Sequence, residues 1–269
     1  MEAGLIPYTA QPFIPCQKAL VFAPHPDDET FGCGGLLAAY KKNGIPTEAI
    51  ILTSGDHGEH GSSGTDVRES ESQCAAKILG IGELHFWREP DRHLNFCERL
   101  IDKVSSAIKS TKSDLVLCPS LYEVHPDHRA CAWLILEAAR RLSVNGYSLS
   151  VAMYEIGTPL TRLSHLVDIS EHAQSKDSAM ACYQSQLQLQ SYDDHIRSLN
   201  RYRSYTLGEQ VKFAEAYWLI DEQDLRESEN LLEAELLRQD RLGLSTTPVP
   251  DAFQPRKANF LQKLFRQDS

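Results

Sequence analysis

The chain has 269 residues, of which 42% are hydrophobic and 24% are charged, and its formal net charge is −10. This is the composition of an ordinary globular protein, and the acidic charge argues against a general nucleic-acid-binding surface. A chain of this length holds one large α/β domain or two small ones, and no stretch reaches the ~18 apolar residues of a transmembrane segment.

Apolar runs of strand length alternate with helical patterns from Lys18 onward. We predict strands at 18–23, 47–53, 83–87, 114–118 and 150–156, and helices at 29–43, 65–79, 95–110 and 126–143. Some of these strands are apolar almost throughout, as expected where helices cover both faces of a parallel sheet. The pattern therefore predicts an α/β fold, a Rossmann-like three-layer sandwich with a mainly parallel sheet and helices on both faces.

The alternation ends after residue 156, where short polar helical stretches follow. We interpret this region, including Phe213–Tyr217, as a C-terminal helical elaboration packed on the sheet. Residues 1–220 are expected to form a single domain. Residues 221–269 are expected to form a charged helix and a loose, basic C-terminal tail, which covers its own domain or, as an alternative, docks on a partner chain or a membrane surface.

Two short motifs carry most of the metal-binding and proton-transferring side chains. His25-Pro-Asp-Asp-Glu29 follows the first predicted strand, and His125-Pro-Asp-His128 follows the fourth. In an open parallel sheet with strand order 3-2-1-4-5, the first and fourth strands are neighbours, and a crevice opens at their carboxyl ends. We therefore expect the two motifs to meet.

The residue types of the two motifs predict a metal site. His25 and Asp28 are three residues apart in a tight turn, so both can face one point, and His128 can complete the set. Three protein ligands with one open position are typical of catalytic zinc. Iron(II) or another divalent metal would accept the same ligands.

The remaining motif residues suit acid–base chemistry. Asp27 is expected to diverge from the metal and act as the general base. His125, when protonated, would stabilise a tetrahedral oxyanion and pass a proton to the leaving amine. Asp127 would orient His125 and raise its pKa. These parts together predict a metal-assisted hydrolase of an acyl group.

Two other segments suggest ligand binding, but we favour a structural interpretation of both. A dinucleotide site needs G-x-G-x-x-G directly after the first strand, whereas Gly32, Gly34 and Gly35 lie inside the following helix and come after acidic residues. We expect these glycines to allow close helix–strand packing. The metal-like segment 56–60 is rich in glycine and charge, which favours a solvated loop; the alternative is contact with substrate at the rim of the crevice.

The cysteines bear on the cellular compartment. The seven cysteines are odd in number, widely scattered and never spaced as C-x-x-C. We expect them to be reduced thiols, and we expect the protein to be cytoplasmic.

The paired His-Pro-Asp motifs closely resemble those of the PIG-L (LmbE-like) deacetylase family, over roughly residues 18–220. Its members are metal-dependent enzymes that remove acetyl from N-acetylglucosamine-type groups on larger conjugates. The resemblance implies the same three zinc ligands, the same base and the same oxyanion-stabilising histidine. It also implies that Arg68 and Asp91 reach substrate hydroxyls, because both match family positions.

We therefore predict a zinc-dependent N-deacetylase that acts on an acetamido sugar carried by a larger molecule and releases acetate. Two alternatives stay open: another metal-dependent amide or phosphoester hydrolase, and a catalytically silent sugar-binding protein. The expected partner is a small-molecule or glycoconjugate substrate, with no nucleic acid and no transmembrane segment. The identity of the attached group and the oligomeric state are left open.

Overall fold

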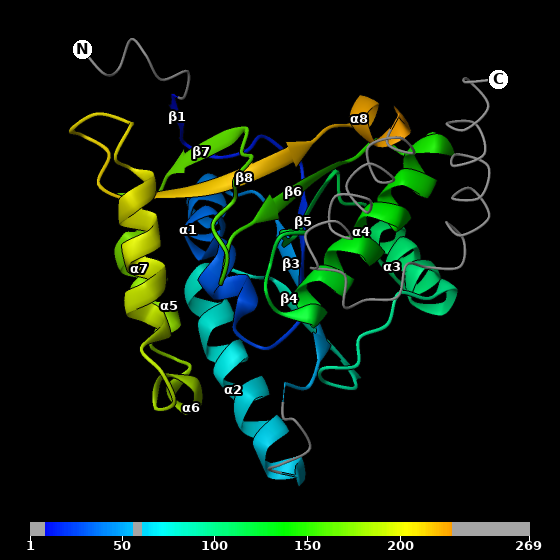
Figure 1. Ribbon diagram of the computed structural model, residues 1–269, viewed down its shortest axis with the longest axis horizontal. Coiled ribbons are helices and arrows are strands. Elements are labelled where there is room, and N and C mark those ends of the chain that lie inside the picture. Colours follow the sequence, from blue (N-terminus) through cyan, green and yellow to red (C-terminus); the bar gives the residue numbers. More distant parts are fainter. Residues whose placement is uncertain (1–8, 56–60, 228–269) are drawn as a thin grey trace, which may run out of the picture.

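The computed structural model describes residues 9–55 and 61–227 of the chain (Figure 1). In this part of the chain, one eight-stranded sheet lies between two layers of helices. The strands are β1 (Ala10–Gln11), β2 (Ala19–Ala23), β3 (Thr47–Thr53), β4 (Glu83–Glu89), β5 (Leu115–Pro119), β6 (Ser150–Tyr154), β7 (His165–Asp168) and β8 (Ala214–Ile220). The helices are α1 (Asp28–Asn43), α2 (Gly61–Leu79), α3 (Glu98–Thr111), α4 (Pro126–Val144), α5 (Ala173–Met180), α6 (Gln184–Leu187), α7 (Tyr192–Arg203) and α8 (Glu222–Glu227).

The strand order confirms the predicted arrangement of the first five strands. The sheet runs β4-β3-β2-β5-β6-β8-β7-β1, and the pairs from β4 to β6 are all parallel. Every predicted strand and helix up to residue 156 is present, with bounds within four residues of those expected. The predicted α/β three-layer sandwich is therefore confirmed.

The prediction was wrong for Phe213–Tyr217, which we had placed in a helical elaboration. These residues run into β8, which pairs antiparallel with both β6 and β7. The elaboration after residue 156 thus adds two strands as well as α5, α6 and α7. Glu215 made this strand hard to recognise, because its carboxylate is buried and bonded to groups distant in the sequence.

Successive side chains of the central strands enter two separate cores. Leu20 and Phe22 of β2 pack in a core with α3 and α4, whereas Ala19 and Val21 pack in a core with α1, α2 and α5. This alternation follows from the two-residue period of a strand. Because both faces of the central sheet are covered, the strand ends are where functional groups can reach solvent.

Close packing of α1 on the sheet confirms the structural interpretation of its glycines. A Cβ atom at Gly32 would lie 2.2 Å from the ring of Tyr154 on β6. A Cβ atom at Gly35 would lie 2.6 Å from the side chain of Ile169. Larger residues at these positions would push α1, and with it the motif at its start, away from the sheet.

The C-terminal segment lies mostly outside the described residues. Of the predicted charged helix, α8 is described and packs against α4 through the buried Leu225. The basic segment 256–266 falls outside the described part, as does the loop 56–60. Our division of the chain at residue 220 therefore stays a prediction. Within the described part, no helix has the length and apolar character that crossing a bilayer requires.

We expect the buried ion pair between Lys176 and Glu215 to be important for stability. The two side chains are almost fully buried and 2.7 Å apart, and Glu215 also accepts hydrogen bonds from the Gly35 and Leu36 amides. Lys176→Met should lower the free energy of unfolding by about 3 kcal/mol, because it leaves a buried carboxylate without its counter-charge. Urea denaturation measures this.

The matched control is Lys42→Met. Lys42 also pairs with a carboxylate, Glu171, but both side chains are exposed, so its urea midpoint should not move. Equal midpoints for the Lys176 variant and the unmodified protein would contradict the importance of the buried pair.

Candidate metal centre and active site

The two His-Pro-Asp motifs meet at the carboxyl ends of β2 and β5. These strands pair in parallel, with Val21 opposite Leu117. His25 lies in the turn between β2 and α1, and His125 caps the N-terminus of α4. The expected convergence of the motifs is therefore confirmed.

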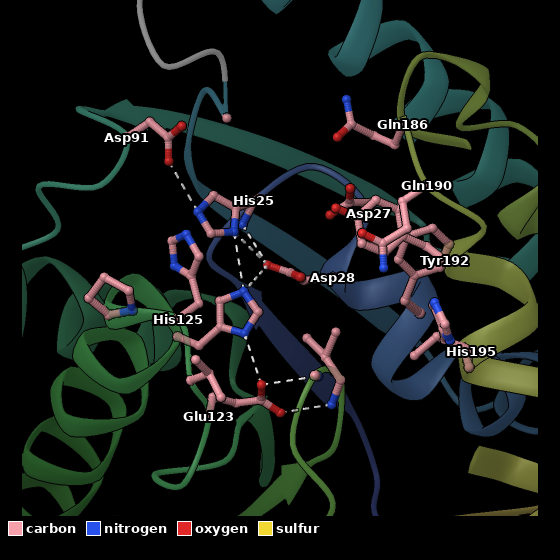
Figure 2. Close-up of a pocket in the computed structure, with 18 of the residues that line it drawn as sticks. His25, Asp27, Asp28, Asp91, Glu123, His125, Gln186, Gln190, Tyr192 and His195 are labelled. Carbon is pink, nitrogen blue, oxygen red and sulfur yellow. Dashed lines mark hydrogen bonds and ion pairs between the residues drawn. The ribbon is translucent and has the colours of Figure 1, made fainter. Parts of the chain in front are cut away.

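Three ligand atoms converge at this point (Figure 2). Nδ1 of His25 lies 3.0 Å from Oδ2 of Asp28, and Nε2 of His128 lies 3.2 Å from the same oxygen. The two histidine nitrogens are 3.3 Å apart. A cation bound at about 2.1 Å would separate its ligands by about 3.0–3.4 Å, so the donor set fits a zinc-sized ion. The three side chains are buried, so the close contact of their lone pairs is unfavourable. A proton or a cation between them removes this penalty.

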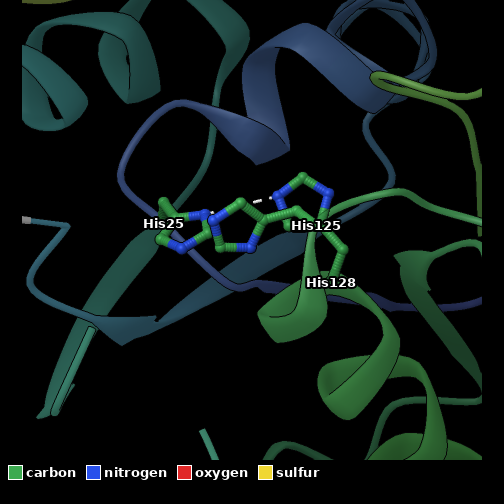
Figure 3. A group of neighbouring side chains, drawn as sticks. All are labelled: His25, His125 and His128. Carbon is green, nitrogen blue, oxygen red and sulfur yellow. Dashed lines mark hydrogen bonds between the residues drawn. The ribbon is translucent and has the colours of Figure 1, made fainter. Parts of the chain in front are cut away.

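Among the described residues, two other groups of side chains that include His25 have ligand atoms within 4.8 Å of one another: His25, His125 and His128 (Figure 3), and His25, Asp91 and Asp127. His25 and His125 meet edge to face, with ring centroids 4.6 Å apart. In the triangle formed by His25, Asp28 and His128, all three distances between ligand atoms lie between 3.0 and 3.3 Å. We therefore take this triangle as the candidate ligand set, with His125 beside it.

The charges of the triangle stabilise positive charge at this point, although burial opposes it. Burial opposes ionisation of Asp28, yet the adjacent His128 and His25 hold its pKa well below the usual range. Burial also works against a charged His128, but Asp28 raises the pKa of this imidazole to about 9. A buried site that stabilises positive charge in this way suits a cation.

Two further carboxylates lie behind the ligand imidazoles. Oδ1 of Asp91 lies 3.1 Å from Nε2 of His25, and Oε2 of Glu123 lies 3.6 Å from Nδ1 of His128. Glu123 is itself held by the amides of Ile156 and Gly157, at 2.9 and 3.0 Å. Carboxylates placed behind metal-binding histidines set the ring orientation and raise ligand basicity.

Asp91 was expected to reach substrate. It lines the cavity, and its buried carboxylate also lies against His25. Glu123 was missed. Its only signal in the sequence was an acid two residues before His125, in a strand-to-helix loop.

Asp27 lies beside the triangle in an unusual backbone conformation. Its φ is 135°, in a region that residues other than glycine rarely occupy and that stores about 1–3 kcal/mol of strain. Burial raises the pKa of its carboxyl to about 7, although the Arg68 guanidinium opposes this. A carboxyl with this pKa can both take up and release a proton near neutral pH.

Arg68 holds the Asp27 turn in place. One of its nitrogens, Nη2, donates to Oδ2 of Asp27 and to the Pro26 carbonyl, each at 2.9 Å, and the other donates to the Gly55 carbonyl. Arg68 lines the cavity, as expected of a residue near substrate. Its hydrogen bonds, however, go mainly to the turn that carries Asp27.

Asp127 was expected to orient His125 and raise its pKa. The charge of Asp127 does favour the imidazolium of His125, but burial and the neighbouring His25 and His128 outweigh it. The Asp127 carboxylate itself accepts from the amides of Arg92 and Leu94, at 2.7 and 3.2 Å, and lies 3.4 Å from Nε2 of His25. Burial, together with His25 and His128, lowers the pKa of His125 to about 4, against our expectation of a raised value.

The hydrogen bond of His125 selects its tautomer. Nδ1 of His125 accepts from the Asp127 amide at 3.2 Å. This nitrogen therefore carries no proton, and in the neutral ring the proton is on Nε2. His125 is thus arranged to donate one hydrogen bond as a neutral imidazole.

A cavity of about 830 Å³ opens over these residues. Its far side is lined by residues of α6, of α7 and of the segment between them: Gln186, Gln190, Tyr192, His195, Ile196 and Leu199. The last five form no motif, and sequence reasoning missed them. Gly55 also lines the cavity, but the adjoining segment 56–60 lies outside the described residues, so its expected role is not tested.

Comparisons with known proteins agree with this geometry. A model of the PIG-L family, described as GlcNAc-PI de-N-acetylase, matches residues 20–139. The chain is 28% identical to a diacetylchitobiose deacetylase of Thermococcus kodakarensis, over 65% of this chain and 72% of the relative. It is 29% identical to a probable N-acetyl-alpha-D-glucosaminyl L-malate deacetylase 2 of Bacillus anthracis, over 63% of this chain and 81% of the relative.

A solved structure shares the fold. The conserved protein TT1542 of Thermus thermophilus superposes with a TM-score of 0.67 and 30% sequence identity. The match covers 75% of this chain and 94% of the other. The fold is therefore shared with a known structure over most of this chain, and the family model covers the positions of both motifs.

We expect Glu123→Gln to weaken zinc binding by about ten- to hundredfold, because the variant loses the charge that supports His128. Competition with a chromogenic chelator measures the affinity. Glu171→Gln, at an exposed carboxylate, is the control and should bind zinc like the unmodified chain. Unchanged affinity in the Glu123 variant would show that His128 needs no such support.

Proposed function

We propose that this chain, which belongs to the PIG-L family, is a zinc-dependent N-deacetylase that removes the acetyl group from an N-acetylglucosamine-type sugar of a larger conjugate. The observation that carries the proposal is the triangle of His25, Asp28 and His128 with Asp27 and His125 beside it. Metal binding alone would need neither Asp27 nor His125. Their presence in the same cavity supports an enzyme over a silent sugar-binding protein.

His25, Asp28 and His128 would hold the metal, and their nitrogen and oxygen donors suit Zn²⁺ while also accepting Fe²⁺ or another divalent ion. When bound, the metal would supply Lewis acidity toward the amide carbonyl and the attacking water. Asp91 and Glu123 keep the two imidazoles oriented for this purpose.

Asp27 performs the proton transfers. It accepts a proton from the water that attacks the amide carbonyl, and a pKa of about 7 lets the resulting acid return the proton to the leaving nitrogen. The C–N bond then breaks, and the products are acetate and the sugar ammonium. Arg68 positions Asp27 by holding the turn at Pro26 and Gly55.

His125 stabilises the tetrahedral intermediate. Its Nε2–H donates a hydrogen bond to the oxyanion that develops on the carbonyl oxygen. This role needs no imidazolium and replaces our expectation of a protonated His125. Asp127 contributes in two ways. Its carboxylate fixes the loop after β4, and its backbone amide donates a hydrogen bond to Nδ1 of His125.

A phosphoester hydrolase is the second candidate with the same ligands, but such enzymes usually use two metals about 3.5–4 Å apart. A cytoplasmic location is inferred from the seven cysteines, which are all free in the structure. The inferred partners are glycoconjugates or small sugar conjugates, without nucleic acid.

The direct test of the function is acetate release from N-acetylglucosamine and its conjugates, with and without a chelator. We expect acetate in the untreated sample, loss of activity on metal removal, and recovery when Zn²⁺ is added back. Phosphate release from a phosphoester in place of acetate, or activity that survives complete metal removal, would contradict the proposal.

Asp27→Asn tests the general base. We expect kcat to fall by about 10²- to 10⁴-fold, because asparagine cannot accept the proton, while bound zinc stays stoichiometric. Steady-state acetate release and metal analysis of the same sample measure both. Asp102→Asn on α3 is the control, since Asp102 is exposed and does not line the cavity. Full activity of the Asp27 variant would remove the assignment.

A further inference from the structure

The active-site cavity extends past the metal ligands to a second wall. Its volume of about 830 Å³ is near the upper end of the ~300–1,000 Å³ range of small-molecule sites. Figure 2 shows Gln186, Gln190, Tyr192 and His195 on the side of the cavity away from Asp91 and His125. The deacetylation steps use none of these four residues. We call them the far wall, and it is available to the part of the substrate beyond the acetamido sugar.

The far wall contains an aromatic platform. Tyr192 begins α7 and packs on the buried Phe31, with ring centroids 6.2 Å apart and planes inclined by 31°. Its side chain is nevertheless 38% exposed and lines the cavity. The negative face of an aromatic ring attracts polarised C–H groups, such as those on one face of a pyranose. Because Phe31 holds the Tyr192 ring in place, the side chain loses little conformational entropy when a ligand stacks on it.

The other members of the far wall are polar: two glutamine amides and one imidazole. The amides of Gln186 and Gln190 each provide both donors and an acceptor, and the His195 imidazole provides one of each when neutral. This combination matches hydroxyl groups, which also donate and accept. It provides no fixed positive charge for a phosphate or carboxylate.

The formal charge of the whole cavity also disfavours an anionic ligand. Its described lining holds four carboxylates and two guanidinium groups: Asp27, Asp28, Asp91, Glu123, Arg68 and Arg92. Arg68 is bonded to Asp27 and to backbone carbonyls. A divalent cation would only bring the formal charge of this set to zero. An anionic group on the substrate would therefore find no surplus of positive potential.

We propose that the far wall binds an uncharged sugar or polyol linked to the acetamido sugar, stacked on Tyr192 and hydrogen-bonded by Gln186, Gln190 and His195. This inference rests on the proposed deacetylase function and names its substrate class. A neutral disaccharide of acetamido sugars is a substrate of this kind.

The test compares acetate release from N,N′-diacetylchitobiose, which is neutral, with release from N-acetylglucosamine 1-phosphate, which is anionic. We expect kcat/KM to be at least about tenfold higher for the disaccharide. Tyr192→Ala should lower kcat/KM for the disaccharide by about tenfold, mainly through KM, and Tyr192→Phe should retain it because the ring is kept. Gln190→Arg should raise kcat/KM for the phosphate relative to the disaccharide.

Tyr202→Ala is the matched control, because Tyr202 is an exposed tyrosine of the same helix that does not line the cavity. Its kcat/KM should equal that of the unmodified chain. Efficient use of the 1-phosphate, or an unchanged KM in Tyr192→Ala, would overturn the inference and leave the deacetylase function intact. Acetate from neither compound, nor from N-acetylglucosamine itself, would contradict the proposed function and this inference with it.

Discussion

The parallel pairing of β2 with β5 is the constraint on which the active site depends. It places the two strand-to-helix turns side by side at one edge of the sheet, so residues a hundred positions apart share one cation site. Neither turn could bind a catalytic metal alone, because His25 and Asp28 provide two ligand atoms and His128 provides the third. The glycines of α1 reinforce this constraint, since they let the helix that carries Asp28 pack tightly against β6.

Once the turns meet, burial determines their chemistry. A group of carboxylates in a closed space stabilises positive charge at His25 and His128, which is the condition for holding a divalent ion. The same burial raises the pKa of Asp27 towards neutrality and lowers that of His125. Burial thus favours the neutral form of both groups. It raises the pKa of the base, Asp27, and lowers the pKa of the oxyanion donor, His125.

How far the sequence predicts this site depends on the range of the interactions involved. The ligands and Asp27 were predictable, because strand order and turn spacing fix where their backbones lie. The contacts of Asp91, Asp127 and Glu123 were not, since they depend on where loops fold and which way a side chain points. Glu215 misled the assignment of β8 for a related reason: its partner Lys176 lies 39 positions away, and no local pattern reveals it. Gln190, Tyr192 and His195 of the far wall form no motif, because scattered polar and aromatic residues in and before α7 look like any solvated surface.

X-ray absorption at the zinc edge of the metal-loaded protein tests the central claim most directly, because it reports the ligands themselves. For the unmodified chain, it should show two imidazole nitrogens and carboxylate oxygen at about 2.0–2.2 Å. His128→Ala should leave one imidazole in the spectrum. An unchanged count of imidazoles in this variant, or a spectrum without histidine scattering, would mean that the two turns do not share a metal.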